Sequence, residues 1–161
     1  RVQAALTWLI GSLNSRGWTE INLAGPPIVF ALVMGLLLSR QLNLLGLGDE
    51  LSVGLGNSLF RSRCLIGASA TLLAASSVSV GGLIGFVGLI VPHAVRFLFG
   101  TDYRIVLPFS ALLGAFTLST ADLIARSGSI ELPVGIITSL VGAPIFIFLL
   151  YRRQKSLTSL R

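Results

Sequence analysis

The adjacent carboxylates Asp49 and Glu50 are the first candidates for chemistry, because paired acids serve as metal ligands or as a general acid and base. No His, Cys or further acid stands beside them in sequence to complete such a site. Glycines surround the pair as in a phosphate-binding loop, but no G-x-x-x-x-G-K-[ST] motif occurs. We therefore expect no P-loop ATP hydrolysis by this chain, and any coupling to ATP would come from another subunit.

Two other residue types capable of chemistry occur once each. His93 follows Pro92 with no second His, Asp or Glu near it, which favours a packing or helix-end role. Cys64 is a lone thiol beside an apolar run, so it excludes an internal disulfide and a cysteine-rich metal site. No arrangement typical of nucleophilic catalysis is present. We therefore expect neither an enzyme nor a resident cofactor or metal.

Three charged residues gather near one apolar run: Asp122, Arg126 and Glu131. Asp122 and Arg126 have the four-residue spacing of an ion pair on one helix. Two interpretations stay open. The arginine either pairs locally with Asp122 or faces outward to meet an acidic partner.

The composition indicates that lipid or other protein surrounds most of the chain. Hydrophobic residues make up 53% of the 161 residues, charged residues only 11%, and the mean hydropathy is +0.89. Soluble domains carry roughly 25% charged residues. The net charge of +6 does not predict nucleic-acid binding, because the basic residues lie at the ends of apolar runs rather than in one patch.

These runs predict an all-α, polytopic transmembrane helical bundle, since about 20 apolar residues cross a bilayer as a helix. We expect about five full spans after a truncated first one, and we interpret the start at Arg1 as a cut inside a longer protein. Pro26 and Pro27 are expected in the first turn of their helix, and Gly81, Gly82 and Gly85 divide one long run. The runs are Val2–Ile10, Ile21–Ser39, Cys64–Val80, Ile84–Leu98, Ile105–Ala121 and Leu132–Tyr151.

The basic residues predict which side of the membrane each loop occupies. With a cytoplasmic C-terminus, alternation of the spans leaves only Arg16 and Arg126 outside. The opposite orientation violates the positive-inside rule almost everywhere. The residues placed inside are Arg1, Arg40, Arg61, Arg63, Arg96, Arg104, Arg152, Arg153, Lys155 and Arg161.

The segment Gln41–Arg63 would then be a cytoplasmic loop, and it is unusually apolar for one. Leucines and valines recur through it around a Gly48-Asp49-Glu50 corner, which predicts short helices with an apolar face. Such helices either lie on the membrane surface or dock a soluble partner. The residues alone leave both alternatives open.

Three segments resemble the FecCD/vitamin B12-type permeases of ABC importers: GFVGLIVPHAVRFLFGTDYRIVLP (85–108), ADLIAR (121–126) and ELPVGIITSLVGAPIFIFLL (131–150). The resemblance implies that residues 1–161 are the C-terminal half of a ten-helix permease domain, with 41–63 as its cytoplasmic coupling loop. It implies a bacterial inner-membrane protein that moves ferric siderophore, haem or cobalamin. WLIGSLNSRGW (8–18) is more similar to siderophore permeases.

The same resemblance implies partners and sites. GDELSVGLG (48–56) stands where the family docks its ATP-binding subunit, which would assign Gly48, Asp49, Glu50 and Gly56 to that contact, although Asp49 replaces the usual glutamate. Arg126 matches an arginine that meets an extracytoplasmic substrate-binding protein. A second permease subunit would complete the pathway. The alternatives are a secondary transporter or channel subunit without an ATPase, and a membrane scaffold with no transport role.

Overall fold

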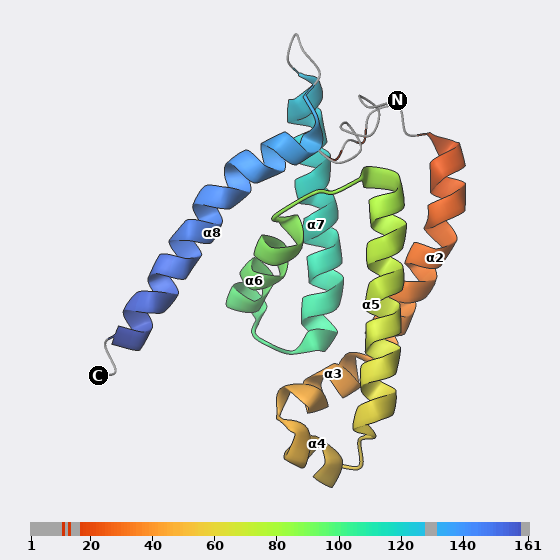
Figure 1. Cartoon of the computed structure of the whole chain (residues 1–161), viewed down its shortest axis with the longest axis vertical. Helices are drawn as coiled ribbons and strands as arrows, with labels where there is room; N and C mark the ends of the chain where they lie inside the picture. Colours follow the sequence, from red (N-terminus) through yellow and green to blue (C-terminus); the bar gives the residue numbers. More distant parts are fainter. Residues whose placement is uncertain (1–10, 12, 14–16, 128–131, 159–161) are drawn as a thin grey trace.

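The computed structural model describes residues 11, 13, 17–127 and 132–158, and every regular element in them is an α-helix (Figure 1). The predicted all-α class is therefore confirmed. The truncated span at Val2–Ile10 lies outside the described residues. The helices are α2 (Trp18–Leu37), α3 (Ser39–Gly46), α4 (Asp49–Gly54), α5 (Leu59–Gly81), α6 (Val87–Phe99), α7 (Tyr103–Arg126) and α8 (Val134–Thr158).

Three of the described helices are long and apolar enough to cross a membrane: α2, α5 and α7. They contain 20, 23 and 24 residues, and at a rise of about 1.5 Å per residue each covers the roughly 30 Å hydrocarbon core. Apolar side chains cover their outer surfaces as well as their contacts; Phe30, Leu112 and Phe116 are all more than 60% exposed. Such surfaces are stable in lipid rather than in water.

Of the two remaining apolar helices, α6 is short, with 13 residues. α8 has 25 residues, and the apolar part whose side chains are described covers Val134–Ile147. The run predicted at Cys64–Val80 is longer in the structure, because α5 already begins at Leu59 inside the predicted loop. The total of five crossings plus a partial one stays a prediction.

Pro26 and Pro27 lie inside α2 rather than in its first turn, so that expectation was wrong. The helix begins earlier because the backbone N–H of Gly17 donates to Glu20 Oε2 at 2.8 Å and holds the first turn. Interior prolines are tolerated in apolar helices of membrane proteins because neighbouring helices and local adjustments satisfy the freed carbonyl groups.

Two helix pairs make up the body of the bundle: α2 packs along α5, and α6 packs along α7 (Figure 1). α8 contacts α6 and α7 near its beginning and then diverges from them toward its C-terminal end (Figure 1). The buried hydrophobic cluster is small and lies where α7 ends and α8 begins, at Ala121, Ala125 and Val134. Small side chains there allow the two helices to approach closely.

The connection between α5 and α6 depends on two unusual backbone conformations. Gly82 has φ of 70°, and Phe86, the residue before α6, has φ of 66°, which L-residues with side chains rarely adopt. The Phe86 ring makes an edge contact with Phe146 of α8 at a centroid distance of 6.3 Å. A Cβ added to Gly142 of α8 would lie within van der Waals overlap of the Phe86 side chain. Gly142 therefore lets α8 pass over this corner.

Candidate functional site

Two short helices, α3 and α4, lie beyond the apolar bundle at the end where α2 finishes and α5 begins (Figure 1). We call residues 39–58 the α3–α4 unit. Gly48 precedes α4 with φ of 98° and Gly56 follows it with φ of 80°. Glycine adopts these left-handed conformations without steric cost. The two glycines therefore set the turns into and out of α4.

A chain of polar side chains holds α4 against the first turn of α5. Asn57 Nδ2 donates to Ser52 Oγ at 2.9 Å, and Ser62 Oγ donates to Asn57 Oδ1 at 2.6 Å. Ser52 is 0% exposed and Ser62 is 4% exposed. The Asn57 backbone N–H also donates to the Ser52 carbonyl at 3.0 Å. Because these polar groups are partnered in a confined space, they give the turn after α4 a defined geometry.

We expect Asn57→Leu to destabilise the α3–α4 unit by about 1–3 kcal/mol, because both serine hydroxyls lose their partner while they remain buried. Hydrogen exchange of the amides in α4 is the appropriate measurement, and it should become faster. Ser58→Ala is the control, since Ser58 is exposed and makes no side-chain bond at the start of α5. Equal exchange in Asn57→Leu and wild type would contradict the role of Asn57.

An exposed ion pair also joins α4 to α5. Arg63 Nη2 lies 2.7 Å from Asp49 Oδ1 and 2.9 Å from Oδ2, and both side chains are more than half exposed. An exposed pair contributes at most about 1 kcal/mol. Its effect is to orient the first turn of α4 and to occupy the Asp49 carboxylate. The neighbouring Glu50 is exposed.

A second polar contact joins α3 to the beginning of α7. Asn43 Nδ2 donates to Asp102 Oδ1 at 2.7 Å, and Asn43 Oδ1 accepts from the Tyr103 backbone N–H at 3.0 Å. Asp102 also accepts from the Arg104 backbone N–H, as a helix N-cap does. The Arg104 backbone N–H and then the Asn43 amide lower the pKa of the Asp102 carboxyl from its ordinary value. Movement of α3 is thus linked to α7.

The outer surface of the α3–α4 unit is apolar although it lies outside the long spans. Its exposed fractions run from 54% to 62% over four side chains. An apolar surface on a rigid unit, bordered by carboxylate and arginine, is suited to contact with another protein. The four residues are Leu47, Leu51, Val53 and Leu55.

Arg126 lies at the opposite end of the bundle, at the end of α7 (Figure 1). Its Nε is 2.9 Å from Asp122 Oδ2, so the local ion pair of the two open interpretations is present. The arginine side chain is still 51% exposed, which leaves its outer edge accessible. Glu131, the third member of the charged group, lies outside the described residues.

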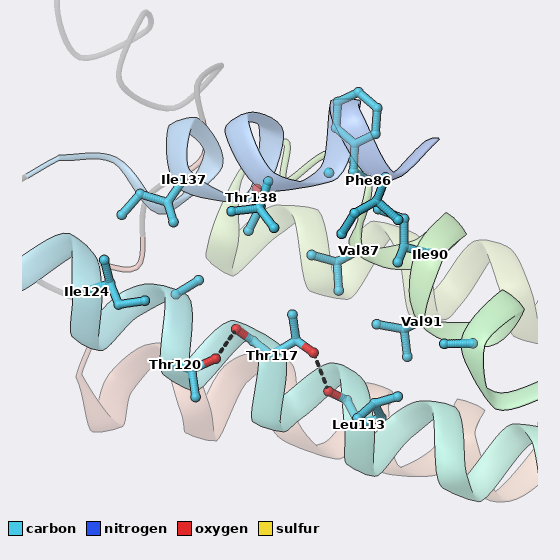
Figure 2. Close-up of a pocket in the computed structure, with 15 residues that line it drawn as sticks. Phe86, Val87, Ile90, Val91, Leu113, Thr117, Thr120, Ile124, Ile137 and Thr138 are labelled. Atoms are coloured by element: carbon cyan, nitrogen blue, oxygen red, sulfur yellow. Dashed lines mark hydrogen bonds between the residues drawn. The ribbon is translucent and has the colours of Figure 1, made fainter. Parts of the chain in front are cut away.

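An apolar cavity of about 360 Å³ lies between α6, α7 and α8 (Figure 2). Its polar atoms are already engaged: Thr117 Oγ1 donates to the Leu113 carbonyl at 2.7 Å, and Thr120 Oγ1 donates within the same helix. Thr138 Oγ1 donates to the Gly135 carbonyl at 3.2 Å. The cavity therefore offers packing space rather than groups for catalysis.

Among the residues that the structure describes, no group of three or more His, Cys, Asp or Glu could hold a metal ion. Cys64 and His93 are both exposed.

The structure brings Gly48, Asp49, Glu50 and Gly56 together on one unit and places Arg126 far from it. Sequence reasoning missed the residues that hold that unit in shape. The opposite charges of Asp49 and Arg63 at the two sides of the loop were a usable signal. The partners of Asn57 and Asn43 gave no such signal in the sequence, because these contacts depend on turns and packing. The partners are Ser52, Ser62, Asp102 and Tyr103.

Comparison with known proteins identifies the family. The model of the FecCD transport family matches residues 1–152. The chain is 44% identical over 153 residues to the cobalamin import system permease protein BtuC of Halobacterium salinarum, covering 95% of this chain and 42% of that protein. It is 43% identical over 146 residues to the Fe(3+)-citrate import system permease protein YfmD of Bacillus subtilis, covering 89% and 44%.

Two further relatives extend the range of cargo and give a solved structure. The hemin transport system permease protein HmuU of Yersinia pestis is 41% identical over 150 residues, covering 92% of this chain and 45% of that protein. An ABC transporter described as of the metal-chelate type, solved in an inward-facing conformation, superposes with a TM-score of 0.84 at 34% identity, covering 94% and 49%.

The chain thus spans about half the length of the relatives it matches. The family match and the apolar helices make it a multi-pass membrane protein with the helical bundle of an ABC permease. On this evidence the chain belongs to the FecCD transport family.

Proposed function

We propose that this chain is part of a permease subunit of an ABC importer that moves ferric siderophore or a related metal chelate into the cytoplasm, driven by a separate ATP-binding subunit. The observation that carries the proposal is the rigid α3–α4 unit, whose apolar face is exposed beyond the long spans. Relatives named for Fe(3+)-citrate, hemin and cobalamin support the class of cargo.

The proposal includes a contact between the ATP-binding subunit and the α3–α4 unit at Gly48, Asp49, Glu50 and Gly56. Closure of two ATP-binding subunits would push this unit, and the link from Asn43 to Asp102 would carry the displacement to α7. The bundle would then alternate between outward-open and inward-open states by rigid-body movement. A second permease subunit, identical or paralogous, would complete the pathway.

The positions of the basic residues in the bundle support the same proposed function. Arg40, Arg61, Arg63, Arg96 and Arg104 lie at the end of the bundle that carries α3 and α4, and α8 runs back toward that end (Figure 1). By the positive-inside rule this end faces the cytoplasm. We accordingly place the chain in the bacterial inner membrane with a cytoplasmic C-terminus.

A proton-coupled carrier is less well supported by the charge distribution. Such carriers place ionisable residues deep within their spans. In α2, α5 and α7 the charged residues all lie among the first five or last five residues of their helix, at Glu20, Arg61, Arg63, Arg104, Asp122 and Arg126.

Arg126 is proposed to meet an acidic group of the substrate-binding protein outside the membrane. We expect Arg126→Glu to weaken binding of that protein by roughly fivefold at low salt, because it replaces attraction with repulsion at an exposed site. Asp122→Asn is the matched control: it breaks the local ion pair but keeps the arginine. Equal affinity for Arg126→Glu and wild type at low salt would remove Arg126 from the contact.

The proposed function is tested by uptake. Cells that lack the intact permease containing this chain, and cells that regain it, are given labelled ferric siderophores, haem and cobalamin. We expect uptake of one chelate to return, which would also name the cargo. No uptake of any of them would contradict the metal-chelate class.

A further inference from the structure

A groove of about 620 Å³ lies between α3 and the connection from α6 to α7. Both elements lie at the end of the bundle that carries α4 (Figure 1). It adjoins the apolar face of the α3–α4 unit at Leu47, whereas Leu51, Val53 and Leu55 do not line it. Arg40 and Asn43 line it from α3, Arg96 lines it from the last turn of α6, and Tyr103 and Arg104 line it from α7. Three arginines therefore line one groove.

Described residues offset the positive charge in this groove only in part, because one carboxylate, Asp102, faces three arginines and attracts Arg104. Asp102 is the carboxylate in the lining, and it accepts hydrogen bonds from the Asn43 amide and the Arg104 backbone N–H. The ion pairs in the described part of the chain, Arg63 with Asp49 and Arg126 with Asp122, involve none of the three groove arginines. The groove thus has an excess of positive charge.

The arginines are also arranged for an anion with several oxygens. Arg96 Cζ lies over the Tyr103 ring at 5.6 Å from its centroid, a cation–π contact that holds the guanidinium next to a residue of the groove. Planar guanidinium groups bind phosphate oxygens through paired N–H groups. Arg40 and Arg104 approach from α3 and α7, so a phosphate group between them would meet donors from two helices.

Part of the groove lining is apolar: Leu44 and Leu47 line it, and Leu47 is 56% exposed. Phe97 and Leu98 follow Arg96 on α6 and are 78% and 67% exposed, outside the groove lining. Phe99 stacks on Phe109 of α7 at 4.5 Å, which holds this end of α6 in place. A ligand that satisfied both surfaces would carry an anionic head and a hydrocarbon tail.

From these observations we infer that the groove binds the phosphodiester headgroup of an anionic membrane phospholipid, with its acyl chains beside Phe97 and Leu98. Basic pockets between spans at the cytoplasmic side are a known setting for acidic lipid headgroups. The inference goes beyond the proposed transport function and does not depend on coupling to ATP. A bound lipid here would touch α3, α6 and α7 together.

The test is titration of the purified, delipidated permease with phosphatidylglycerol, read by native mass spectrometry. Each arginine near an anionic surface contributes about fivefold to affinity. We therefore expect Arg40→Gln/Arg104→Gln to weaken phosphatidylglycerol binding by about 25-fold. Arg61→Gln is the matched control, because Arg61 is exposed at the same end of the bundle and does not line the groove. Thermal stability of each variant is compared to exclude misfolding.

Three results would overturn the inference. The first is an equal loss of affinity in Arg61→Gln, which would indicate nonspecific attraction. The second is full competition by glycerol 3-phosphate at the concentration of the lipid, which would indicate a site for a free phosphate without a tail. The third is displacement of the lipid by the ATP-binding subunit, which would make the groove part of a protein contact.

Discussion

Gly142→Ala is expected to destabilise the permease by about 3 kcal/mol, the upper end of the typical range for an overpacked interior. The added methyl group would overlap the Cβ and Cγ atoms of Phe86, which belong to the base of a side chain and have little freedom to move. Phe86 is itself held at φ of 66° and against Phe146. We expect a lower melting temperature and less monodisperse protein in detergent.

Two variants make this prediction specific. Gly114→Ala in α7 should be neutral or slightly stabilising, because no atom of the described residues lies within 4 Å of its added Cβ and alanine favours a helix. Phe86→Gly/Gly142→Ala should recover part of the loss, since glycine removes both the overlap and the positive-φ strain. A fully stable Gly142→Ala protein would contradict the close passage of α8 over the corner at Phe86.

Leu51→Asp is expected to weaken binding of the ATP-binding subunit by at least about 30-fold, as loss of a central interface residue does. Leu51 is 61% exposed on α4 and lies beside Glu50. The introduced aspartate carboxylate would face the partner protein, and α4 contains no positive charge that could pair with it. Copurification of the ATP-binding subunit with the intact permease measures the effect. Leu132→Asp is the control, because Leu132 is an exposed leucine beyond the far end of α7.

Glu50→Arg should also weaken binding of the ATP-binding subunit, because it reverses a charge on the same surface. Gly56→Asp is a less selective probe, since φ at Gly56 is 80° and any side chain there also strains the turn after α4. If the ATP-binding subunit copurifies normally with both Leu51→Asp and Glu50→Arg, the assignment of the α3–α4 unit as the coupling contact is wrong.

The long helices were predictable because an apolar run without charges has few alternatives in lipid. Their ends were not, since α2 begins at Trp18 through the bond from Gly17 to Glu20, and α5 extends back to Leu59. The break between α5 and α6 was foreseen from its glycines. Its dependence on Phe86 and Gly142 was not, because that contact joins residues far apart in the chain.

The candidate site, too, was predictable from the sequence only in part. The apolar residues around the Gly48-Asp49-Glu50 corner marked the unit, because ordinary short loops between spans are polar, and the family resemblance singled out its glycines and acids. The contacts that make the unit rigid were invisible, since Asn57 and Asn43 are polar residues of ordinary appearance until turns and packing supply their partners. The docking role of Arg126 stays a prediction, and the structure shows its pairing with Asp122, which is one of the two open interpretations.

The most direct test of the central claim is chelate uptake by proteoliposomes that contain the intact permease, with and without its ATP-binding subunit. We expect uptake only when both the subunit and ATP are present, and we expect Leu51→Asp to abolish it while Leu132→Asp retains it. Uptake that proceeds at the wild-type rate without ATP or the ATP-binding subunit would contradict the account and indicate a secondary transporter or channel.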